Sequence, residues 1–455
     1  MRRLRTTMDG NDKVADFILG MSWEGLPAAV RRRAKMCWLD NLGATLGGTL
    51  TPVSRLAAEY AAHTWRGDEA TILLHGRRAT AAGAAFANAC AGNGLDIDDD
   101  AIYTRGHPGA QLFPVVLAVG EQVGASGKAV LEAMVIGYEV AIRAGHCWHD
   151  YHQEYQGDGA WGSVANAAAA ARLLGLNREQ IKHALGIAEY FSPNAPLMRD
   201  IDCPTMVKHG IAWGALTGVV AAQLAQRGFT GIPSLLGMAK YREWVTDIGE
   251  QYMMADWVFY KGWASCAWGH PACVAARELV TQHNLALEDI VHIRVRTFEE
   301  AIRLHQGYPS TTEEAQFSVV WPLACLLLDG EIGPDQILEH RFGDPKVRAL
   351  VDKIELVLDP DIDALYDALQ EMDLRMYSAV EIFTRDGRRF DSGIVERAAD
   401  VWDEQALERK FRWLVSYVLP PASVEQLVRA SADLENMPDI RPFTALLAEG
   451  GVAHA

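Results

Sequence analysis

The stretch ANAAAAARLLGLNREQIKHALGIAEYF, residues 165–191, decides the fold class because it reads as two consecutive helices. Its first part is rich in alanine, which has the highest helix propensity, and Gly175 is placed to end that helix. Asn177 and Gln180 then form a capping-box pattern at the start of the second helix. The stretch therefore predicts two helices joined by a tight connection.

Helical periodicity extends from this stretch in both directions, through about residue 260. Alanine-rich helices predicted at 79–92 and 211–225 would pack tightly with it as a central bundle. Another helix is predicted over 26–48, with Pro27 at its start. Strand signals are scarce in this part of the chain apart from TILLH at 71–75.

The hydrophobic periodicity of the sequence changes from helical to strand-like after about residue 285. Residues 291–298, VHIRVRTF, alternate apolar and polar side chains as a half-buried strand does, and IELVLD at 354–359 continues this pattern. The segment VEIFTRDGRRFDSGIV, residues 380–395, predicts a hairpin with Asp386-Gly387 at its turn. Helical stretches are expected near 313–328, near 361–371 and, with Asp403 as N-cap, at 403–419.

These patterns predict a mainly α fold in two parts. A large all-helical domain would comprise residues 1–267 and be completed by residues 399–455. A smaller α+β domain at about 268–398 would be inserted between them. At 455 residues the chain is too long for one compact core, which also favours two domains.

Composition and charge narrow the classes of partner. Hydrophobic residues make up 49% and charged residues 22%, the balance of a soluble globular protein. The net charge of −17 argues against nucleic-acid binding and requires local cations wherever an anion binds. Seven cysteines are dispersed, and the longest apolar run, 210–222, is too short to span a bilayer comfortably. We therefore expect a cytoplasmic protein that binds neither nucleic acid nor membranes.

The stretch GLDIDDDAIYTRGHPGAQLFP, residues 94–114, places four carboxylates ahead of a His-Pro-Gly. A calcium loop counted from Asp96 needs glycine sixth and glutamate twelfth, where this chain has Ala101 and His107. The spacing also differs from the DDxxD of helical terpenoid synthases. The sequence therefore predicts no metal here and leaves two interpretations, a solvated acidic loop or the acid/base part of an active site.

His107 is the most informative residue of this stretch. Pro108 suits the first turn of a helix over 109–124, so His107 is predicted at or before a helix N-terminus. The helix dipole disfavours imidazolium there and the nearby aspartates favour it, so the opposed effects predict a pKa near neutrality, suited to proton transfer. A histidine that merely caps the helix is the alternative.

Other clusters were candidates for metal or nucleotide binding. The segment HCWHDYH at 146–152 has histidines at helical spacing but no HExxH glutamate, and Cys266, His270 and Cys273 read as buried residues rather than ligands. The chain has no P-loop or dinucleotide fingerprint, so no nucleotide cofactor is expected.

Two lysines stand among apolar residues, Lys208 in PTMVKHGIAWG and Lys261 in DWVFYKGWASCAWGHPA. Such a lysine either extends its ammonium group to the surface or points into a cavity as a counter-ion. In a chain of charge −17, this pair could supply the local cations that an anion site needs.

Several segments together resemble the MmgE/PrpD family, which includes 2-methylcitrate dehydratase, cis-aconitate decarboxylase and iminodisuccinate epimerase. The most specific is FANACAGNGLDIDDDAIYTRGHPGAQLFPVVLAVGE, which is similar to the family's AHALDFDD…HPG segment. The resemblance covers nearly the whole chain. It extends to the Lys208 and Lys261 segments, to EEAQFSVVWPLACLLLDGEI at 313–332 and to RKF at 409–411.

The resemblance implies a cofactor-independent enzyme, usually a homodimer, with a helical domain, an α+β lid and an active site between them. Carried over by motif, Asp96 and His107 match the family's catalytic aspartate and histidine, while Lys208 and Lys261 match lysines that hold substrate carboxylates. Removing a proton or carbon dioxide next to a carboxylate builds negative charge that ammonium groups stabilise, while His107 moves the proton.

Four positions depart from the family pattern. Gln156 stands where YH..G..G has histidine, Trp321 where FSxPY has tyrosine, Asp100 near the threonine of DFDDT, and Asn93 at the histidine of HALD. We expect Gln156, Trp321 and Asp100 to contact the substrate and to set its identity apart from the best-known ones.

The leading hypothesis is a lyase, without metal or cofactor, that acts on a small anionic polycarboxylate or hydroxy acid. Dehydration is favoured over decarboxylation. An epimerase is the alternative enzyme, and a non-catalytic homologue that binds a carboxylate is the alternative from a different class.

Overall fold

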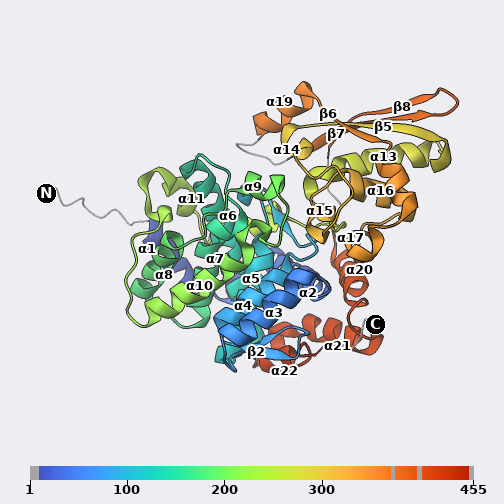
Figure 1. Ribbon diagram of the computed structural model, residues 1–455. Coiled ribbons are helices and arrows are strands. Elements are labelled where there is room, and N and C mark those ends of the chain that lie inside the picture. The colour runs from blue at the N-terminus through green and yellow to red at the C-terminus, as the bar shows by residue number, and fades with distance from the viewer. Residues whose placement is uncertain (1–9, 370–374, 397–401, 450–455) are drawn as a thin grey trace.

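The computed structural model describes residues 10–369, 375–396 and 402–449, and it shows a large helical lobe with a smaller lobe beside it (Figure 1). The two helices predicted within 165–191 are confirmed as α7 (Asp158–Leu173) and α8 (Arg178–Tyr190). Gly175, with φ of +68°, lies between them, and Asn177 and Gln180 form the predicted capping box. The fold class is mainly α with a smaller α+β domain, as predicted.

The helical lobe is built around α7, which packs against α5, α6, α8 and α10. The alanines at 167–171 are completely buried, because their small side chains let these helices approach closely. The other helices of this lobe before residue 260 are α1 (Gly10–Gly20), α2 (Ala28–Gly48), α3 (Pro52–Thr64), α4 (Ala81–Gly92), α5 (Pro108–Val123), α6 (Gly127–Tyr151), α9 (Leu197–Asp202), α10 (Ile211–Gln226), α11 (Arg242–Thr246) and α12 (Met254–Trp257).

Two short antiparallel strand pairs accompany these helices. The strand predicted at 71–75 is confirmed only at residues 71 and 72, which lie in β1 (Ala70–Ile72), and β1 pairs with β2 (Arg77–Ala79). The pair β3 (Asp100–Ala101) and β4 (Val258–Phe259) matters more for function. Because Asp100 pairs with Phe259, this bridge holds the aspartate-rich loop beside the segment that leads to Lys261.

The smaller lobe contains a four-stranded sheet in the order β6-β5-β7-β8. The strands are β5 (Ile290–Thr297), β6 (Ile354–Leu358), β7 (Tyr377–Thr384) and β8 (Arg389–Glu396). Strands β5 and β6 are parallel and the other pairs antiparallel, and the predicted hairpin turns at Gly387, whose φ is +84°. Its helices are α13 (His270–Gln282), α14 (Glu299–Ile302), α15 (Thr312–Gln316), α16 (Val320–Asp329), α17 (Pro334–Ile337), α18 (Pro345–Val351) and α19 (Pro360–Leu369).

One helix prediction in this lobe needs correction. The stretch 313–328 forms two helices, α15 and α16, because the chain leaves helical geometry at Phe317, where φ is −88° and ψ is +56°. This break turns Gln316 and Phe317 toward the helical lobe, where they meet residues of the site described below.

The chain returns to the helical lobe through α20 (Glu404–Val415), α21 (Pro421–Ala432) and α22 (Arg441–Ala445). Asp403 caps α20 as predicted, and α20 packs along α2. Lys410 forms a buried ion pair with Asp40, 2.5 Å apart, which fixes the two helices together. Figure 1 shows these helices below and beside α2.

Two hydrophobic cores lie among the described residues. One core draws its members from residues 14–260 and 407–447, and the other draws most of its members from residues 264–382. The predicted boundary at 398/399, the two chain ends and residues 370–371 lie outside the described residues. Within the described ranges, no helix has both the length and the apolar character needed to cross a membrane.

Candidate active site

The loop between α4 and α5 carries the four aspartates of the 94–114 stretch. All four are buried, with at most 5% of any of them exposed. The interpretation of this stretch as a solvated acidic loop is therefore wrong. Carboxylates in such a position need cations or hydrogen-bond donors beside them, and each of these has a different set.

Asp99 anchors the loop and the start of α5. Its carboxylate accepts hydrogen bonds from the amide of Asn41 (3.0 Å), from the backbone N–H of Gly109 (3.0 Å) and from the hydroxyl of Tyr138. Burial raises the pKa of Asp99 to about 7. These contacts hold the helix N-terminus that carries His107.

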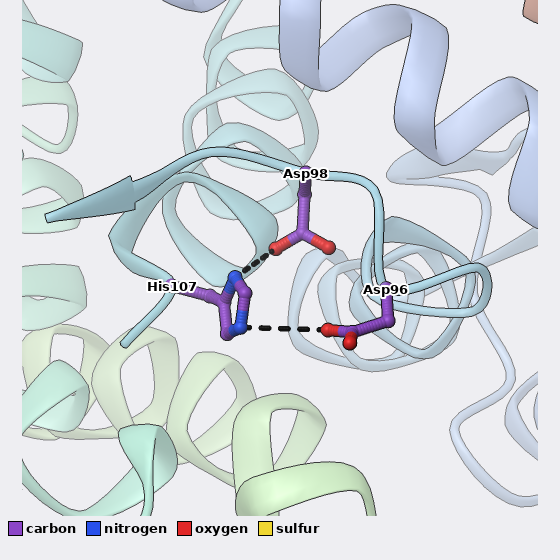
Figure 2. A group of neighbouring side chains, drawn as sticks. All are labelled: Asp96, Asp98 and His107. Carbon is purple, nitrogen blue, oxygen red and sulfur yellow. Dashed lines mark ion pairs between the residues drawn. The ribbon is translucent and has the colours of Figure 1, made fainter. Parts of the chain in front are cut away.

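His107 is the N-cap residue of α5, with Pro108 at the first helical position as predicted. Its ring lies between two carboxylates (Figure 2). Nδ1 is 3.0 Å from Asp98 Oδ2, and Nε2 is 3.4 Å from Asp96 Oδ1. Asp98 is itself positioned by the amide of Asn93, which donates to Oδ1 at 2.9 Å.

The near-neutral pKa predicted for His107 is wrong. Burial lowers the pKa of this imidazole, but the carboxylate of Asp98, helped by that of Asp96, outweighs burial and raises it to about 10. His107 is therefore an imidazolium at neutral pH and can donate a proton without first acquiring one. The sequence placed aspartates nearby but could not show that both ring nitrogens face carboxylates.

Lys261 completes this charged group from the other side. Its ammonium nitrogen lies 3.2 Å from Asp96 Oδ1, and the side chain is fully buried. Burial alone raises the pKa of Asp96, but Lys261, Lys208 and His107 hold it well below its usual range. Within the described chain, Asp96 is the one ionic partner of an ammonium that has three donors, so Lys261 can take a further anionic ligand.

Lys208 is buried nearby and faces the smaller lobe. Its ammonium donates to Gln316 Oε1 at 2.7 Å and lies 4.6 Å from the centre of the Phe317 ring. The two predicted lysines therefore both point inward, as counter-ions rather than surface residues, and both act on Asp96.

The group Asp96, Asp98 and His107 has the residue types of a metal site, and one ligand atom from each lies within 4.8 Å of the others. The local charges disfavour a cation there. The imidazolium of His107 and the ammonium of Lys261 already neutralise the two carboxylates. The absence of a metal from the reaction stays a prediction.

A small pocket opens beside His107, at the junction of the two lobes. Its cavity volume is about 40 Å³, roughly the space of one water molecule. The side chains that line the pocket from the helical lobe are mainly polar, and those from the smaller lobe are mainly apolar. The lining residues are Asp100, Arg105, Gly106, His107, Tyr155, Asp158, Leu197, Ile201, His209, Cys266, Ala267, Trp268 and Met376.

Three departures from the family pattern have different placements. Asp100 lines the pocket directly. Gln156 is buried next to it, but its Oε1 accepts from the backbone N–H of Ala195 at 3.0 Å, so the amide supports the pocket wall. Trp321 lies in the core of the smaller lobe, where its indole donates to Gln336 O at 2.9 Å. The structure does not bring Trp321 to the pocket.

The remaining histidines and cysteines of interest do not converge on a site. His149 Nε2 contacts the carbonyl of Thr104 at 2.8 Å, and His146 stacks on Trp244. Cys266 lines the pocket, and burial raises the pKa of its thiol to about 12. No second group with the residue types and spacing of a metal site occurs among the described residues.

Sequence reasoning missed two acid/base side chains of the pocket. Asp158 accepts from the backbone N–H of His107 at 3.2 Å, and burial raises its pKa to about 6. His209 follows Lys208 directly and faces His107. Asp158 lies two residues after Gln156, and His209 directly follows Lys208. This closeness to two predicted site residues is the sequence signal that could have identified them.

Comparison with known proteins identifies the family of this chain. The MmgE/PrpD N-terminal domain matches residues 12–241 and the MmgE/PrpD C-terminal domain matches residues 263–436. The chain belongs to the MmgE/PrpD family, as the sequence predicted.

Among its relatives are a decarboxylase and a dehydratase. Human cis-aconitate decarboxylase is 27% identical over 466 residues, which cover 96% of this chain and 94% of that protein. Cis-aconitate decarboxylase of Aspergillus terreus is 23% identical over 96% of this chain and 95% of its own. Escherichia coli K12 2-methylcitrate dehydratase is 25% identical over 60% of this chain and 62% of its own. These relatives support a lyase.

Proposed function

We propose that this protein is a cofactor-independent lyase that eliminates water from a small hydroxy-polycarboxylate. One observation carries the proposal: His107, held between the carboxylates of Asp98 and Asp96, lines the pocket, and the buried ammonium group of Lys261 lies beside Asp96. An acid beside two cations suits a reaction in which an anionic substrate loses a hydroxyl group.

The substrate class follows from charge. The protein carries −17 overall, so an anion needs local cations. Lys208 and Lys261 do not line the pocket in this structure, but both are buried and both act on Asp96, and we assign them as these cations. The ammonium group of Lys261 has unused N–H donors. Lys208 can replace its hydrogen bond to Gln316 with one to a substrate carboxylate. Because the pocket holds little more than a water molecule, it must widen between the lobes to admit such a substrate.

The roles of the side chains follow from their protonation. His107 donates its proton to the departing oxygen, while Lys208 and Lys261 stabilise the negative charge that develops on the substrate carboxylate. Asp96 and Asp98 hold His107 in its charged form, so we assign them to positioning and tuning. Asp100 also lines the pocket, and we assign its carboxyl group to accept a hydrogen bond from a substrate hydroxyl or other donor.

The named relatives support both elimination and decarboxylation. Decarboxylation needs one acid to protonate a carbanion, whereas dehydration needs a base and an acid. Dehydration is favoured because the pocket holds further proton-active groups besides His107, among them Asp158. The same set also suits an epimerase, which removes and returns a proton at one carbon.

Proton NMR in D₂O tests these alternatives. The protein is incubated with citrate-like, aspartate-like and unsaturated acids, and the signals are followed over time. Dehydration of a hydroxy acid produces new alkene signals, decarboxylation produces the signals of an acid with one carboxylate fewer, and epimerisation places deuterium at an intact carbon. If no acid reacts or exchanges while one raises the melting temperature, the protein is a carboxylate-binding homologue and the proposal is wrong.

The family resemblance also implies a homodimer. Large hydrophobic side chains stand exposed along α8 and α10 and just beyond them, which supports a covered face there. They are Tyr190, Phe191, Trp213, Val220 and Phe229. Light scattering on the eluting protein measures the oligomer, and a monomer at all concentrations would contradict this assignment.

A further inference from the structure

We infer that His209, paired with Asp200, is the second proton-transfer residue of this site and acts as the base opposite the acid His107. The inference rests on the proposed function and extends it by naming the base. Four observations about His209 support it: its place in the pocket, its partner, its backbone and its neighbours.

His209 lines the same pocket as His107. The two imidazole rings are nearly parallel, with an angle of 7° and centroids 6.0 Å apart. One substrate molecule in this pocket can therefore reach both rings. Phe317 of the smaller lobe packs edge-on against His209, with 5.2 Å between ring centroids, and fixes the plane of the ring.

Asp200, on α9, orients the ring. Its Oδ2 lies 3.2 Å from His209 Nδ1 and also accepts from the His209 backbone N–H at 2.7 Å. Nδ1 lies close to this carboxylate, although the pair does not have hydrogen-bond geometry. A proton on Nδ1 is favoured by the nearby charge and leaves the lone pair on Nε2, which lies no closer to Asp200 and is the ring nitrogen available to a substrate. A histidine oriented in this way is a base.

The backbone supports an active role for this residue. Lys208, His209 and Gly210 have φ values of +41°, +57° and +72°, three consecutive left-handed residues. Side chains other than glycine disfavour this region, and such strain concentrates at functional sites. The turn sends Lys208 toward Gln316 while His209 faces the pocket.

The neighbouring segment is built to receive this turn. A side chain at Gly159 would place its Cβ 2.0 Å from Gly210 O, and one at Gly157 would come within 2.8 Å of His209 O. Gln156, where the family pattern has a histidine, directly precedes these glycines, and its amide is engaged with Ala195. His209 thus supplies an imidazole to the pocket wall, where residue 156 is a glutamine instead of the histidine of the family pattern.

The charged groups around His209 differ from those around His107. Asp200 contacts it, and the carboxylates of Asp158 and Asp96 act on it more distantly. Lys208 on its own turn and His107 on α5 oppose protonation. His107 by contrast has a carboxylate at each ring nitrogen, whereas His209 has one, at Nδ1.

In a β-hydroxy acid, His209 Nε2 takes the proton from the carbon next to the carboxylate, and the C–H electron pair becomes the new C=C bond. The C–O bond breaks at the neighbouring carbon, and its electron pair takes the proton of His107, so that water leaves. His209 then returns its proton to solvent and His107 regains one.

Kinetics of H209Q and D200N in the full chain test this inference, with H292Q as the control because His292 lies on β5 and pairs with Glu355. We expect H209Q to lower kcat at least a hundredfold with KM changed less than threefold, and to abolish the rise of kcat with pH. D200N should lower kcat about tenfold or more and shift the pH at which kcat rises. Near wild-type kcat with the rise intact in H209Q would overturn the assignment.

A second measurement separates this inference from the proposed function. Nitrogen-15 NMR of histidine-labelled wild-type protein, assigned with H209Q, reports which ring nitrogen of His209 carries the proton. We expect the neutral Nδ1–H form at pH 7 to 8. If the acids give no reaction, the proposed function fails while this form still supports His209 as a base. An imidazolium or an Nε2–H form over that pH range overturns the assignment, whatever the turnover.

Discussion

Replacing Asp98 with asparagine should lower the pKa of His107 markedly, so that this residue loses its proton at a lower pH than in the wild type. The carboxylate of Asp98 lies 3.0 Å from His107 Nδ1, and both side chains are buried. Asparagine keeps the size of the side chain and can still accept a hydrogen bond from Asn93, but it removes the charge. The variant therefore isolates the electrostatic effect from packing.

Two independent routes give the size of the effect. The pKa of His107 rises from 6.5 to about 10, which corresponds to about 5 kcal/mol at roughly 1.4 kcal/mol per unit. Opposite unit charges 3.0 Å apart interact by about 5 to 6 kcal/mol at an effective dielectric constant of about 20. Because Asp96 supplies part of the rise, we expect D98N to lower the pKa of His107 by about two units or more.

The assay is an NMR titration of histidine-labelled protein between pH 5 and 10. Asp40 provides the matched control, since it is a buried aspartate paired with Lys410 and does not touch His107. D98N should titrate at His107 within this range, and D40N should behave like the wild type. A His107 pKa in D98N within half a unit of the wild-type value would refute the reasoning.

The same variant changes the dependence of stability on pH. The folded pKa of His107 exceeds its ordinary value of 6.5, so protonated His107 stabilises the fold fully below about pH 6.5. This stabilisation is lost as the pH rises toward 10. The free energy of unfolding of the wild type should therefore fall between pH 7 and 9 by more than that of D98N, and equal slopes in urea titrations would count against it.

Three further predictions concern the pocket and its ligands. K208A should raise KM at least tenfold with little change in kcat, because Lys208 binds a carboxylate; an unchanged KM removes it from the site. Dialysis against EDTA should leave turnover unchanged, whereas loss that Mg²⁺ or Zn²⁺ restores would identify Asp96, Asp98 and His107 as a metal site. In D158N, the pH dependence of kcat/KM should lose a transition near pH 6, because burial raises the pKa of Asp158 to that range; an unaltered profile would exclude this carboxyl from the reaction.

The helical scaffold was accessible from the sequence because its signals are local. The alanines at 167–171, the glycine at 175 and the Asn177 cap depend on neighbours within a few positions, and each took the predicted structure. The hairpin at Gly387 was accessible for the same reason. The break at Phe317 was not, and there Gln316 and Phe317 contact Lys208 and His209, which are distant in the sequence.

The site was accessible only in part. Motif positions identified Asp96, His107, Lys208 and Lys261, which the structure brings together. The charge state of His107 was not accessible, because it depends on which carboxylate faces which ring nitrogen.

The placement of two other residues could not be predicted from the sequence. Trp321 looked like a site residue by its place in a motif, yet its side chain points into the core of the smaller lobe. His209 was not predicted because its position depends on a left-handed turn, and the neighbouring sequence contains no pattern that predicts this turn.

Turnover by H107Q, measured beside the wild type on the acid that reacts in D₂O, tests the central claim most directly. General acid–base groups contribute about a hundredfold to ten-thousandfold, so we expect kcat to fall by about a thousandfold in this variant. Its circular dichroism should stay native, and tricarballylate should still raise its melting temperature. A correctly folded H107Q that turns over within tenfold of the wild type would contradict the account.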